Sequence, residues 1–574
     1  MRIVCRLSAG FTLLFLLPAT ASAQTIAPEA SKAVAFNVRD YGAIGNGTTS
    51  DTPAINKTIR ACASAGGGVV FFPPGQYVTG TFELLSHVTL YLEAGAVILG
   101  SNDINDYGLI RDYGLGRNYG VDSSGEGDRV GLIVAKDVEN VAILGHGTID
   151  GRGDGFMDFS TSHISADFDS QYTRNPEQFS QAVRNLDYGP VEPKEHGAGR
   201  PGTMLIFWRC KDVLIRDVTL RNAPNWTLHL QTSEQIVISG LHILNNLLIP
   251  NNDGIDCMGC RHVHISDCDI QAGDDDFAIV GSEDVNVSNC SLVSRSAAIR
   301  LEDTRFATFQ GLSIFSNRGI GIFQRGSEIT DSVLFSNIVL RTKLIPGHWW
   351  GKAEPIYVAV SPCEGQNCRG KLRNVRFNTI TADGEAGILI YGTRDTPVED
   401  FSLEGVRLHI HSPDTIFASG VGGNFDLRWT ATSLKDAVFQ HDIPGIYCRW
   451  ATGLKIRGLE LQWGDGLPSY FSDGIQCEDF RNLEIDRFGG RQAQTRGATI
   501  SLARGDGVSI SNSMAGRGTD VFLRHSDVTG KRSLLDDDLG AAKKAIEPLS
   551  TGIRMSGVVL PAKVPKAIAP ASKQ

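Results

Sequence analysis

The chain repeats a short pattern in which apolar and polar positions alternate. The clearest copies are CKDVLIRDVTL from Cys210, SEQIVISGLHI from Ser233, CRHVHISDCDI from Cys260 and SEDVNVSNCSL from Ser282, and their starts are 23, 27 and 22 residues apart. Weaker copies are VENVAILGHGTIDG from Val138, and later LRNVRFNTITA, ATGLKIRGLEL and FRNLEIDRFGG. Each copy contains two short alternating runs, which predict strands with one buried face.

A period of 20–30 residues indicates structural units that stack on one another. Short strands at this spacing would also suit an antiparallel sandwich. Two-residue hairpin signals are scarce, however, and Val, Ile and Leu recur at matching positions of successive copies. Stacked parallel coils align like residues in ladders, and a sandwich does not require this. We therefore predict an all-β chain folded as a right-handed parallel β-helix.

One segment near the N-terminus has a helix pattern instead. In FNVRDYGAIGNGTTSDTPAINKTIRACASAGGGVVFFPPGQYVTG, Asp51 is the expected cap, Pro53 lies in the first turn and Gly66 ends the helix. The open end of a β-helix is a sheet edge that must be covered, and this helix is expected to cover it. We predict that the β-helix domain spans residues 34–530.

Both ends of the chain differ in composition from this domain. Arg2 and Arg6 precede an apolar run, and small residues follow at 21–23. This pattern predicts a signal peptide over residues 1–23 and a secreted or periplasmic protein; the apolar run is too short to span a bilayer. From about residue 531 to 574 the chain becomes charged, with an expected helical piece and then a disordered tail.

The net charge bears on the binding partners, and the cysteines bear on possible disulfides and metal sites. The net charge of −10 gives no support for nucleic acid or an anionic membrane, and we expect a monomer. Cys363 and Cys368 flank a tetrapeptide and are the best candidates for a disulfide. Cys257 and Cys260 have metal-type spacing, but no second pair follows with zinc-site spacing. We interpret them as buried side chains or a local disulfide.

Residues 251–282 contain seven aspartates, three of them consecutive. Asp253 and Asp274 are 21 residues apart, about one coil, so they are expected on neighbouring rungs about 4.8 Å apart. Asp275 follows directly, and a bend at Gly273 would let both consecutive carboxylates face one groove. Such a trio suits glycoside hydrolysis, in which one acid protonates the leaving oxygen and another activates water. Polar residues collecting at coil corners are the alternative.

Residues 36–400 resemble the family 28 glycoside hydrolases, the polygalacturonase and pectin-hydrolase group. The resemblance rests on RPGTMLIFWRCKDVLIRDVTLRNAPNWTLHL, on NNDGID where the family has Asn-Thr-Asp-Gly-Ile-Asp, and on GDDDFAIVGS where it has Gly-Asp-Asp. FNVRDYGA and GGGVVFFPPGQY also resemble the opening of pectin-active β-helix proteins. The resemblance implies that Asp274 is the general acid, that Asp253 and Asp275 position and activate water, and that no cofactor or metal is needed. It implies no role for Asp276.

The chain departs from the family pattern at two places. Where the family has Gly-His-Gly, this sequence has Ser294, Arg295 and Ser296. Where the family has Arg-Ile-Lys, whose cations hold the substrate carboxylate, it has Gly321, Ile322 and Phe323. These departures leave the aspartates intact and leave the specificity for galacturonate open.

Nearby residues are candidates to replace the missing cations. Four arginines lie on the two following coils: Arg295, Arg300, Arg318 and Arg325. An arginine can bind a sugar carboxylate through two hydrogen bonds, and Arg295, at the position of the missing histidine, is the first choice. Each arginine could instead pair with an aspartate or face solvent. In residues 347–357, a sugar platform is expected from Trp349 and Trp350, with polar groups from Lys352, Glu354 and Tyr357. A packed loop on the flank of the helix is the alternative.

The favoured interpretation is a secreted inverting hydrolase that acts on a pectic or related acidic plant polysaccharide or oligosaccharide. One rival is a lyase on the same fold that holds Ca²⁺ at the aspartates and uses an arginine as base. Another is a carbohydrate-binding β-helix without catalysis. Residues 107–128 or 156–199 are long enough to block one end of a groove, as exo action requires.

Overall fold

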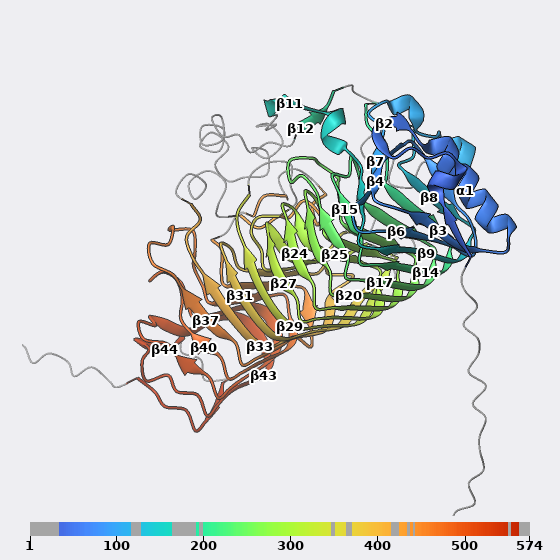
Figure 1. Ribbon diagram of the computed structural model, residues 1–574. Coiled ribbons are helices and arrows are strands. Elements are labelled where there is room, and N and C mark those ends of the chain that lie inside the picture. The colour runs from blue at the N-terminus through green and yellow to red at the C-terminus, as the bar shows by residue number, and fades with distance from the viewer. Residues whose placement is uncertain are drawn as a thin grey trace, which may run out of the picture.

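The computed structural model describes residues 34–115, 128–162, 191–194, 199–325, 327–345, 351–362, 370–414, 424–432, 437–439, 442–548 and 553–561. Parallel strands stack along the molecule from the blue N-terminal end to the red C-terminal end (Figure 1). The predicted right-handed parallel β-helix is confirmed. Residues 1–23, predicted as a signal peptide, lie outside the described residues.

Each regular coil contributes one strand to each of three sheets, which we call the first, second and third sheets. The first sheet contains β5 (Phe82–Leu84), β8 (Ile133–Lys136), β13 (Leu205–Trp208), β16 (Leu228–Gln231), β19 (Ile255–Met258), β22 (Phe277–Val280), β25 (Ala297–Glu302), β28 (Arg318–Gln324), β30 (Ile356–Val360), β32 (Ile388–Tyr391), β34 (Ile446–Arg449), β38 (Ile475–Glu478) and β44 (Lys544–Glu547).

The second sheet contains β1 (Ala35–Asn37), β3 (Gly68–Phe72), β6 (Val88–Leu92), β9 (Glu139–Gly145), β14 (Lys211–Arg216), β17 (Glu234–Ser239), β20 (Arg261–Ser266), β23 (Glu283–Ser288), β26 (Arg305–Gln310), β35 (Ala451–Thr452), β36 (Lys455–Arg457), β39 (Arg481–Asp486) and β45 (Arg554–Ser556). The third contains β2 (Asn46–Ser50), β4 (Gly75–Thr79), β7 (Ala96–Gly100), β10 (Thr148–Asp150), β15 (Thr219–Arg221), β18 (His242–Leu244), β21 (Asp269–Ala272), β24 (Ser291–Ser294), β27 (Ser313–Ser316), β37 (Glu460–Trp463), β40 (Gly489–Gly490) and β42 (Met514–Ala515).

Five long strands run through two sheets. They are β29 (Ile329–Thr342), β31 (Lys371–Gly384) and β33 (Val398–Ile410) in the second and third sheets, and β41 (Ile500–Ser511) and β43 (Val521–Leu535) in the first and second. A separate antiparallel pair is formed by β11 (Met157–Ser162) and β12 (Val191–Pro193). The 3-10 helices are η1 (Val38–Tyr41), η2 (Ile104–Asp106), η3 (Ile110–Tyr113) and η4 (Gly153–Phe156).

The register aligns like residues from coil to coil and so explains the sequence repeat. Leu228 pairs with Ile255, which pairs with Phe277, and all three side chains are fully buried. In the second sheet, Phe335 stacks between Phe309 and Phe377, with ring centroids 4.8 and 4.6 Å apart. These apolar ladders form the core, because each coil buries its inward face only against its neighbours.

The predicted helix is confirmed as α1 (Thr52–Ser64), and it lies at the N-terminal end of the β-helix (Figure 1). Its buried residues, among them Ile55 and Ile59, pack into the core. Asp51 is the N-cap residue, as predicted, but its carboxylate makes no capping hydrogen bond to the helix and accepts the backbone N–H groups of Ile44 (2.6 Å) and Gly45 (3.1 Å) instead. No helix in the described ranges is long and apolar enough to cross a membrane.

Strands continue beyond the expected C-terminal boundary at residue 530. β43 crosses it, and β44 and β45 follow, where the sequence suggested a charged helical piece. The physical reason is that Leu534, Leu539 and Ile546 still face the core, with exposures of 0, 0 and 7%. Residues 562–574 lie outside the described part.

The described cysteines are free and buried, including Cys257 and Cys260. Of the two interpretations from the sequence, buried side chains are therefore what the structure shows for this pair. Cys363 and Cys368, the predicted disulfide, fall outside the described residues.

Candidate active site

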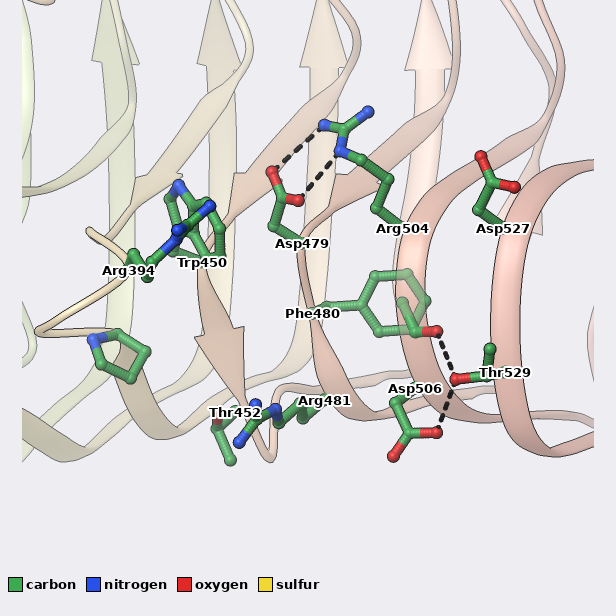
Figure 2. A pocket seen from close by; sticks show the side chains of 12 residues that line it. Arg394, Trp450, Thr452, Asp479, Phe480, Arg481, Arg504, Asp506, Asp527 and Thr529 are labelled. Atoms are coloured by element: carbon green, nitrogen blue, oxygen red, sulfur yellow. Dashed lines mark hydrogen bonds and ion pairs between the residues drawn. The ribbon is translucent and has the colours of Figure 1, made fainter.

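A wide pocket on the C-terminal coils lies in the turns that follow the first sheet (Figure 2). One of its carboxylates, Asp479, is neutralised by arginines. Asp479 accepts hydrogen bonds from Arg449 (3.0 Å) and Arg504 (2.9 Å). Burial would raise the pKa of Asp479, but these two arginines hold it below its usual value. An acid that stays ionised cannot donate a proton to a leaving group, so this pocket does not supply general acid catalysis at Asp479.

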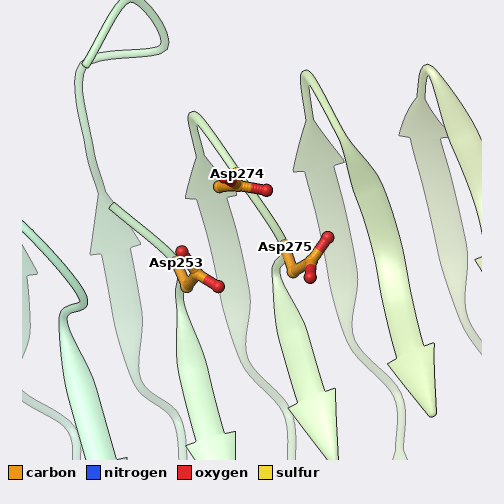
Figure 3. A group of neighbouring side chains, drawn as sticks. All are labelled: Asp253, Asp274 and Asp275. Carbon is orange, nitrogen blue, oxygen red and sulfur yellow. The ribbon is translucent and has the colours of Figure 1, made fainter. Parts of the chain in front are cut away.

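The predicted aspartates come together at the turns that lead into β19 and β22 (Figure 3). Asp253 precedes β19, and Asp274 and Asp275 precede β22 on the next coil. One carboxyl oxygen from each aspartate lies within 4.8 Å of the others. The bend depends on Gly273, because a Cβ there would lie 2.4 Å from the Ile249 carbonyl oxygen. The structure thus brings together the three residues that the sequence singled out.

The surroundings of these aspartates favour their neutral forms. Burial, followed by the negative charge of Asp274, raises the pKa of Asp275 to about 7. Burial raises the pKa of Asp253 well above its usual value, and the neighbouring carboxyls add to the effect. Burial also raises the pKa of Asp274, while the nearby Ser296 hydroxyl and the Arg300 charge act in the opposite direction. A carboxyl that stays protonated near neutral pH can act as a general acid, and a neighbour must be ionised to act as the base; because one negative charge raises the pKa of the carboxyls beside it, the cluster favours such a mixed state.

A fourth carboxyl, Asp256, belongs to the same cluster and was not predicted. It is fully buried, and neither oxygen has a hydrogen-bond partner within the described residues. Burial and then the charge of Asp275 raise its pKa well above the usual value. Strand alternation was the available signal, because Ile255 and Cys257 point inward and Asp256 between them must point to the outer face.

Arg300 is the cation beside this cluster. Its Nη1 atom lies 3.9 Å from Asp275 Oδ2, and its Nε donates to Glu302 Oε1 at 2.8 Å. Burial alone would lower the pKa of Arg300, but the charges of Glu302 and Asp275 raise it above its usual value. About a third of its side chain remains exposed, so it can also reach a bound molecule.

The other three candidate arginines lie in different surroundings. Arg318 is fully buried and donates from Nη2 to Asp426 Oδ2 at 2.8 Å. Arg325 donates from Nε to Glu302 at 3.2 Å and lies 4.5 Å from the Trp429 ring centroid. Arg295 is 8% exposed and lies in the turn between β24 and β25.

A small pocket joins the aspartates to this arginine-rich region. It is lined by Asp275, Ala297, Arg300, Arg318, Phe323 and Trp429. Trp429 and Asp426 were not predicted from the sequence, because they are more than 100 residues from the coil that they contact and carry no local motif. Arg295 is not among the lining residues.

Residues 351–357 do not form the expected sugar-facing surface. Lys352, Glu354 and Tyr357 are 4, 0 and 0% exposed. Glu354 accepts a hydrogen bond from the Asp426 amide at 2.8 Å, and the Arg318 guanidinium lies 3.8 Å from the Tyr357 ring centroid. Glu354 and Tyr357 therefore contact the buried Arg318 guanidinium and do not face a substrate. Trp349 and Trp350 lie outside the described residues.

Two parts of the chain match known family profiles. Residues 192–295 match the profile described as "Glycosyl hydrolases family 28", and this stretch contains Asp253, Asp274 and Asp275. Residues 35–143 match "Rhamnogalacturonase A/epimerase, pectate lyase-like". The first match thus covers the aspartates of the candidate site, and the second covers the N-terminal coils.

Two similar proteins carry names of polygalacturonase-type enzymes. A "Probable polygalacturonase" of Vitis vinifera is 30% identical over 42% of this chain and 43% of its own length. An "Exo-poly-alpha-D-galacturonosidase" of Dickeya chrysanthemi is 26% identical over 42% of this chain and 41% of its own. The chain therefore spans less than half the length of these relatives.

Among solved structures, an exopolygalacturonase from Thermotoga maritima shares the fold. It superposes with a TM-score of 0.50 at 21% identity, over 66% of this chain and 87% of that one. The profile match over the aspartate coils and the relatives agree with the residue pattern and with the geometry of the site. Residues 192–295 are therefore similar to glycoside hydrolase family 28, and about two fifths of the chain is similar to polygalacturonases.

Proposed function

We propose that this protein is a glycoside hydrolase that cleaves a pectic or related acidic plant polysaccharide, as the polygalacturonases similar to it are named for doing. The observation that carries the proposal is the convergence, beside Arg300, of three carboxyls with raised pKa, and these three carboxyls lie within the stretch that matches the family profile. Elevated pKa values at a concave, charged site are typical of acid–base catalysts.

In this proposal Asp274 protonates the glycosidic oxygen, and Asp253 and Asp275 position and activate water. The bond between the anomeric carbon and the leaving oxygen breaks, the water oxygen bonds to the anomeric carbon, and one water proton passes to a carboxylate. Inversion follows from the family resemblance. The carboxyl oxygens lie within 4.8 Å of one another, closer than the roughly 6.5–9.5 Å common for inverting pairs, so measuring the product anomer is the direct test.

The register supports Arg300 as a replacement for the missing Arg-Ile-Lys cations. Gly321 and Phe323 occupy the outward positions of β28 where the resemblance places those cations, and Arg300 is the direct strand neighbour of Gly321. Its guanidinium therefore projects from the adjacent coil onto the same face. An arginine there matches the planar geometry of a sugar carboxylate.

A reducing-sugar assay on polygalacturonate tests the proposed activity. Wild-type protein is expected to release reducing ends, and Asp274→Asn is expected to lower the rate by about 10²–10⁴-fold because it removes the proton donor. Asp269→Asn is the matched control, because Asp269 is exposed on the preceding strand of the third sheet. Full activity in Asp274→Asn would reject its role, and a wild-type protein that binds glycans without turnover would favour the non-catalytic rival.

A lyase is the second candidate, because three carboxyl oxygens within 4.8 Å could also hold a divalent cation. A lyase would depend on Ca²⁺ and form an unsaturated product that absorbs ultraviolet light. For a hydrolase we expect unchanged activity after EDTA treatment and no such absorbance. Loss of activity with EDTA, restored by Ca²⁺ and accompanied by ultraviolet absorbance, would establish the lyase instead.

We also propose that the protein acts outside the cytoplasm on cell-wall polysaccharide. The support is the sequence pattern of residues 1–23, in which basic residues precede a short apolar run and a small-residue site. N-terminal sequencing of protein recovered from the periplasm or medium is expected to begin at Gln24. Recovery of the uncleaved chain from the cytoplasm would contradict this proposal.

A further inference from the structure

The outer face of the first sheet is covered immediately beyond the candidate site. The row of outward residues that contains Arg300 continues through Gly321 to Tyr357, Leu389 and Tyr447 on the following strands. Outward side chains of a β-helix normally face solvent or a groove, yet Tyr357, Leu389 and Tyr447 are only 0, 0 and 2% exposed. Another part of the chain must therefore lie over β30, β32 and β34.

The covering part is residues 424–432 and 437–439, which we call the cover segment. Phe425 and Phe439 pack on the Tyr447 ring, with centroid distances of 6.4 and 5.0 Å. The segment also has internal structure, because Asp426 and Val438 form an antiparallel bridge. The Phe439 amide donates to Asn424 Oδ1 at 2.7 Å. It is thus a folded element that occupies the outer face.

Two side chains of the cover segment reach the candidate site. Asp426 accepts hydrogen bonds from Arg318 (2.8 Å) and from the Gly351 amide (3.3 Å). Trp429 packs edge-on against Phe323 with ring centroids 5.0 Å apart, and it lines the same pocket as Asp275. β28 is two coils from β22, so this wall stands only about 10 Å along the axis from Asp275, given a rung spacing of about 4.8 Å.

The N-terminal side of the same face is also covered. Ile110 and Leu115 form an apolar cluster with Val134, Ile206 and Trp208 of β8 and β13. Ile110 and Leu115 belong to residues 107–128, a stretch that is long enough to block one end of a groove. Between the two covers lie β16, β19, β22, β25 and β28, which carry the aspartates and Arg300. A glycan lying along the helix axis would therefore meet packed chain at either end of these five strands.

We propose that the enzyme cleaves its glycan from a chain end and releases a short product, with the cover segment occupying the positions that internal cleavage would need. This inference rests on the proposed hydrolase function and concerns where on the chain the bond is cut. Trp429 limits how far the glycan can extend along the sheet, because it lines the pocket and packs on Phe323 of β28. A chain end fits against such a wall, whereas the middle of a long polymer cannot pass through it.

The products of wild-type protein on polygalacturonate and on length-defined oligogalacturonides test the inference. We expect a single short product from the earliest time points, with viscosity falling only in proportion to the reducing ends released. An early ladder of intermediate lengths with a rapid fall in viscosity would overturn the inference and leave the hydrolase function standing. No release of reducing ends from these substrates would instead overturn the proposed function, and the inference with it.

The role of the wall is tested by Trp429→Ala with Trp450→Ala as the matched control. Trp450 is also a partly buried tryptophan in contact with an arginine, but it lines the pocket on the C-terminal coils. After circular dichroism has confirmed folding, Trp429→Ala is expected to raise the fraction of intermediate-length products several-fold, and Trp450→Ala to match wild type. An unchanged product pattern in folded Trp429→Ala would refute the role of the wall. Should the variant not fold, the wild-type pattern still decides the cleavage mode.

Discussion

Three consecutive aspartates have different surroundings and therefore different expected roles. Asp274 and Asp275 join Asp253 at the outer face, whereas Asp276 is fully buried. Burial, followed by the charge of Asp275, raises the pKa of Asp276 well above its usual value. Burial therefore favours its neutral form over its charged form. This explains how the chain tolerates three adjacent acidic residues without three adjacent negative charges.

The neutral state of Asp276 leads to a test by isosteric substitution. Asparagine has nearly the shape of a protonated aspartic acid, so Asp276→Asn is expected to retain most of the hydrolysis rate. Asp275→Asn is expected to lose about 10²–10⁴-fold, because it removes a group that activates water. The measurement is kcat on polygalacturonate for both variants. A loss in Asp276→Asn as large as that in Asp275→Asn would show that Asp276 takes part in catalysis.

The raised pKa of Asp275 also predicts how stability depends on pH. Its pKa is about 7 in the folded protein, against about 3.9 in an unfolded chain. The folded state thus binds this proton more tightly, so the contribution to stability is present below pH about 4 and is lost as pH rises through 7. Asp275→Asn is expected to melt at a higher temperature than wild type at pH 7.5 and at nearly the same temperature at pH 4. An equal difference at both pH values would contradict the assignment.

At the scale of elements, the coils depend on ladders of identical side chains. Phe309, Phe335 and Phe377 stack through β26, β29 and β31 with nearly parallel rings. Each ring fills the space that its neighbours leave, so the loss of the central one opens a cavity that the stacked coils cannot close.

A pair of phenylalanine substitutions tests this ladder. Phe335→Ala is expected to lower the free energy of unfolding by about 3–5 kcal/mol. Phe306→Ala is the control, because Phe306 is 57% exposed on the adjacent strand β26, and its change should stay within about 0.5 kcal/mol. Urea denaturation followed by circular dichroism measures both. Equal effects would mean that the ladder does not dominate the stability of these coils.

The coils could be predicted from the sequence, but the cover segment could not. Strand alternation and the 22–27-residue period are local, and they already place Asp253 and Asp274 on neighbouring rungs. The contact between Arg318 and Asp426 joins residues 108 positions apart, and no pattern in either segment indicates it. The same reason explains why Lys352, Glu354 and Tyr357 were expected at the surface, since the segment that buries them is remote in sequence.

At the scale of the whole molecule, stacking lets a side chain on one coil take the place of a charged side chain that the next coil lacks. Gly321 and Phe323 replace two cations of the family pattern, and Arg300 reaches the same face from the preceding coil. In the sequence, the 21-residue spacing between Arg300 and Gly321 is about one coil, and it could have indicated that the two residues are neighbours. The solenoid is long (Figure 1), and the aspartates, Arg300 and the two covers occupy a short part of it.

We propose that this site hydrolyses a glycosidic bond by inversion. Proton NMR of the first products from an α-linked oligogalacturonide tests it most directly, because the anomeric signal reports the configuration before mutarotation. We expect the β-anomer of the new reducing end to accumulate first, and its signal to be absent with Asp274→Asn. Initial formation of the α-anomer, or an unsaturated product in place of a new reducing end formed by hydrolysis, would contradict it.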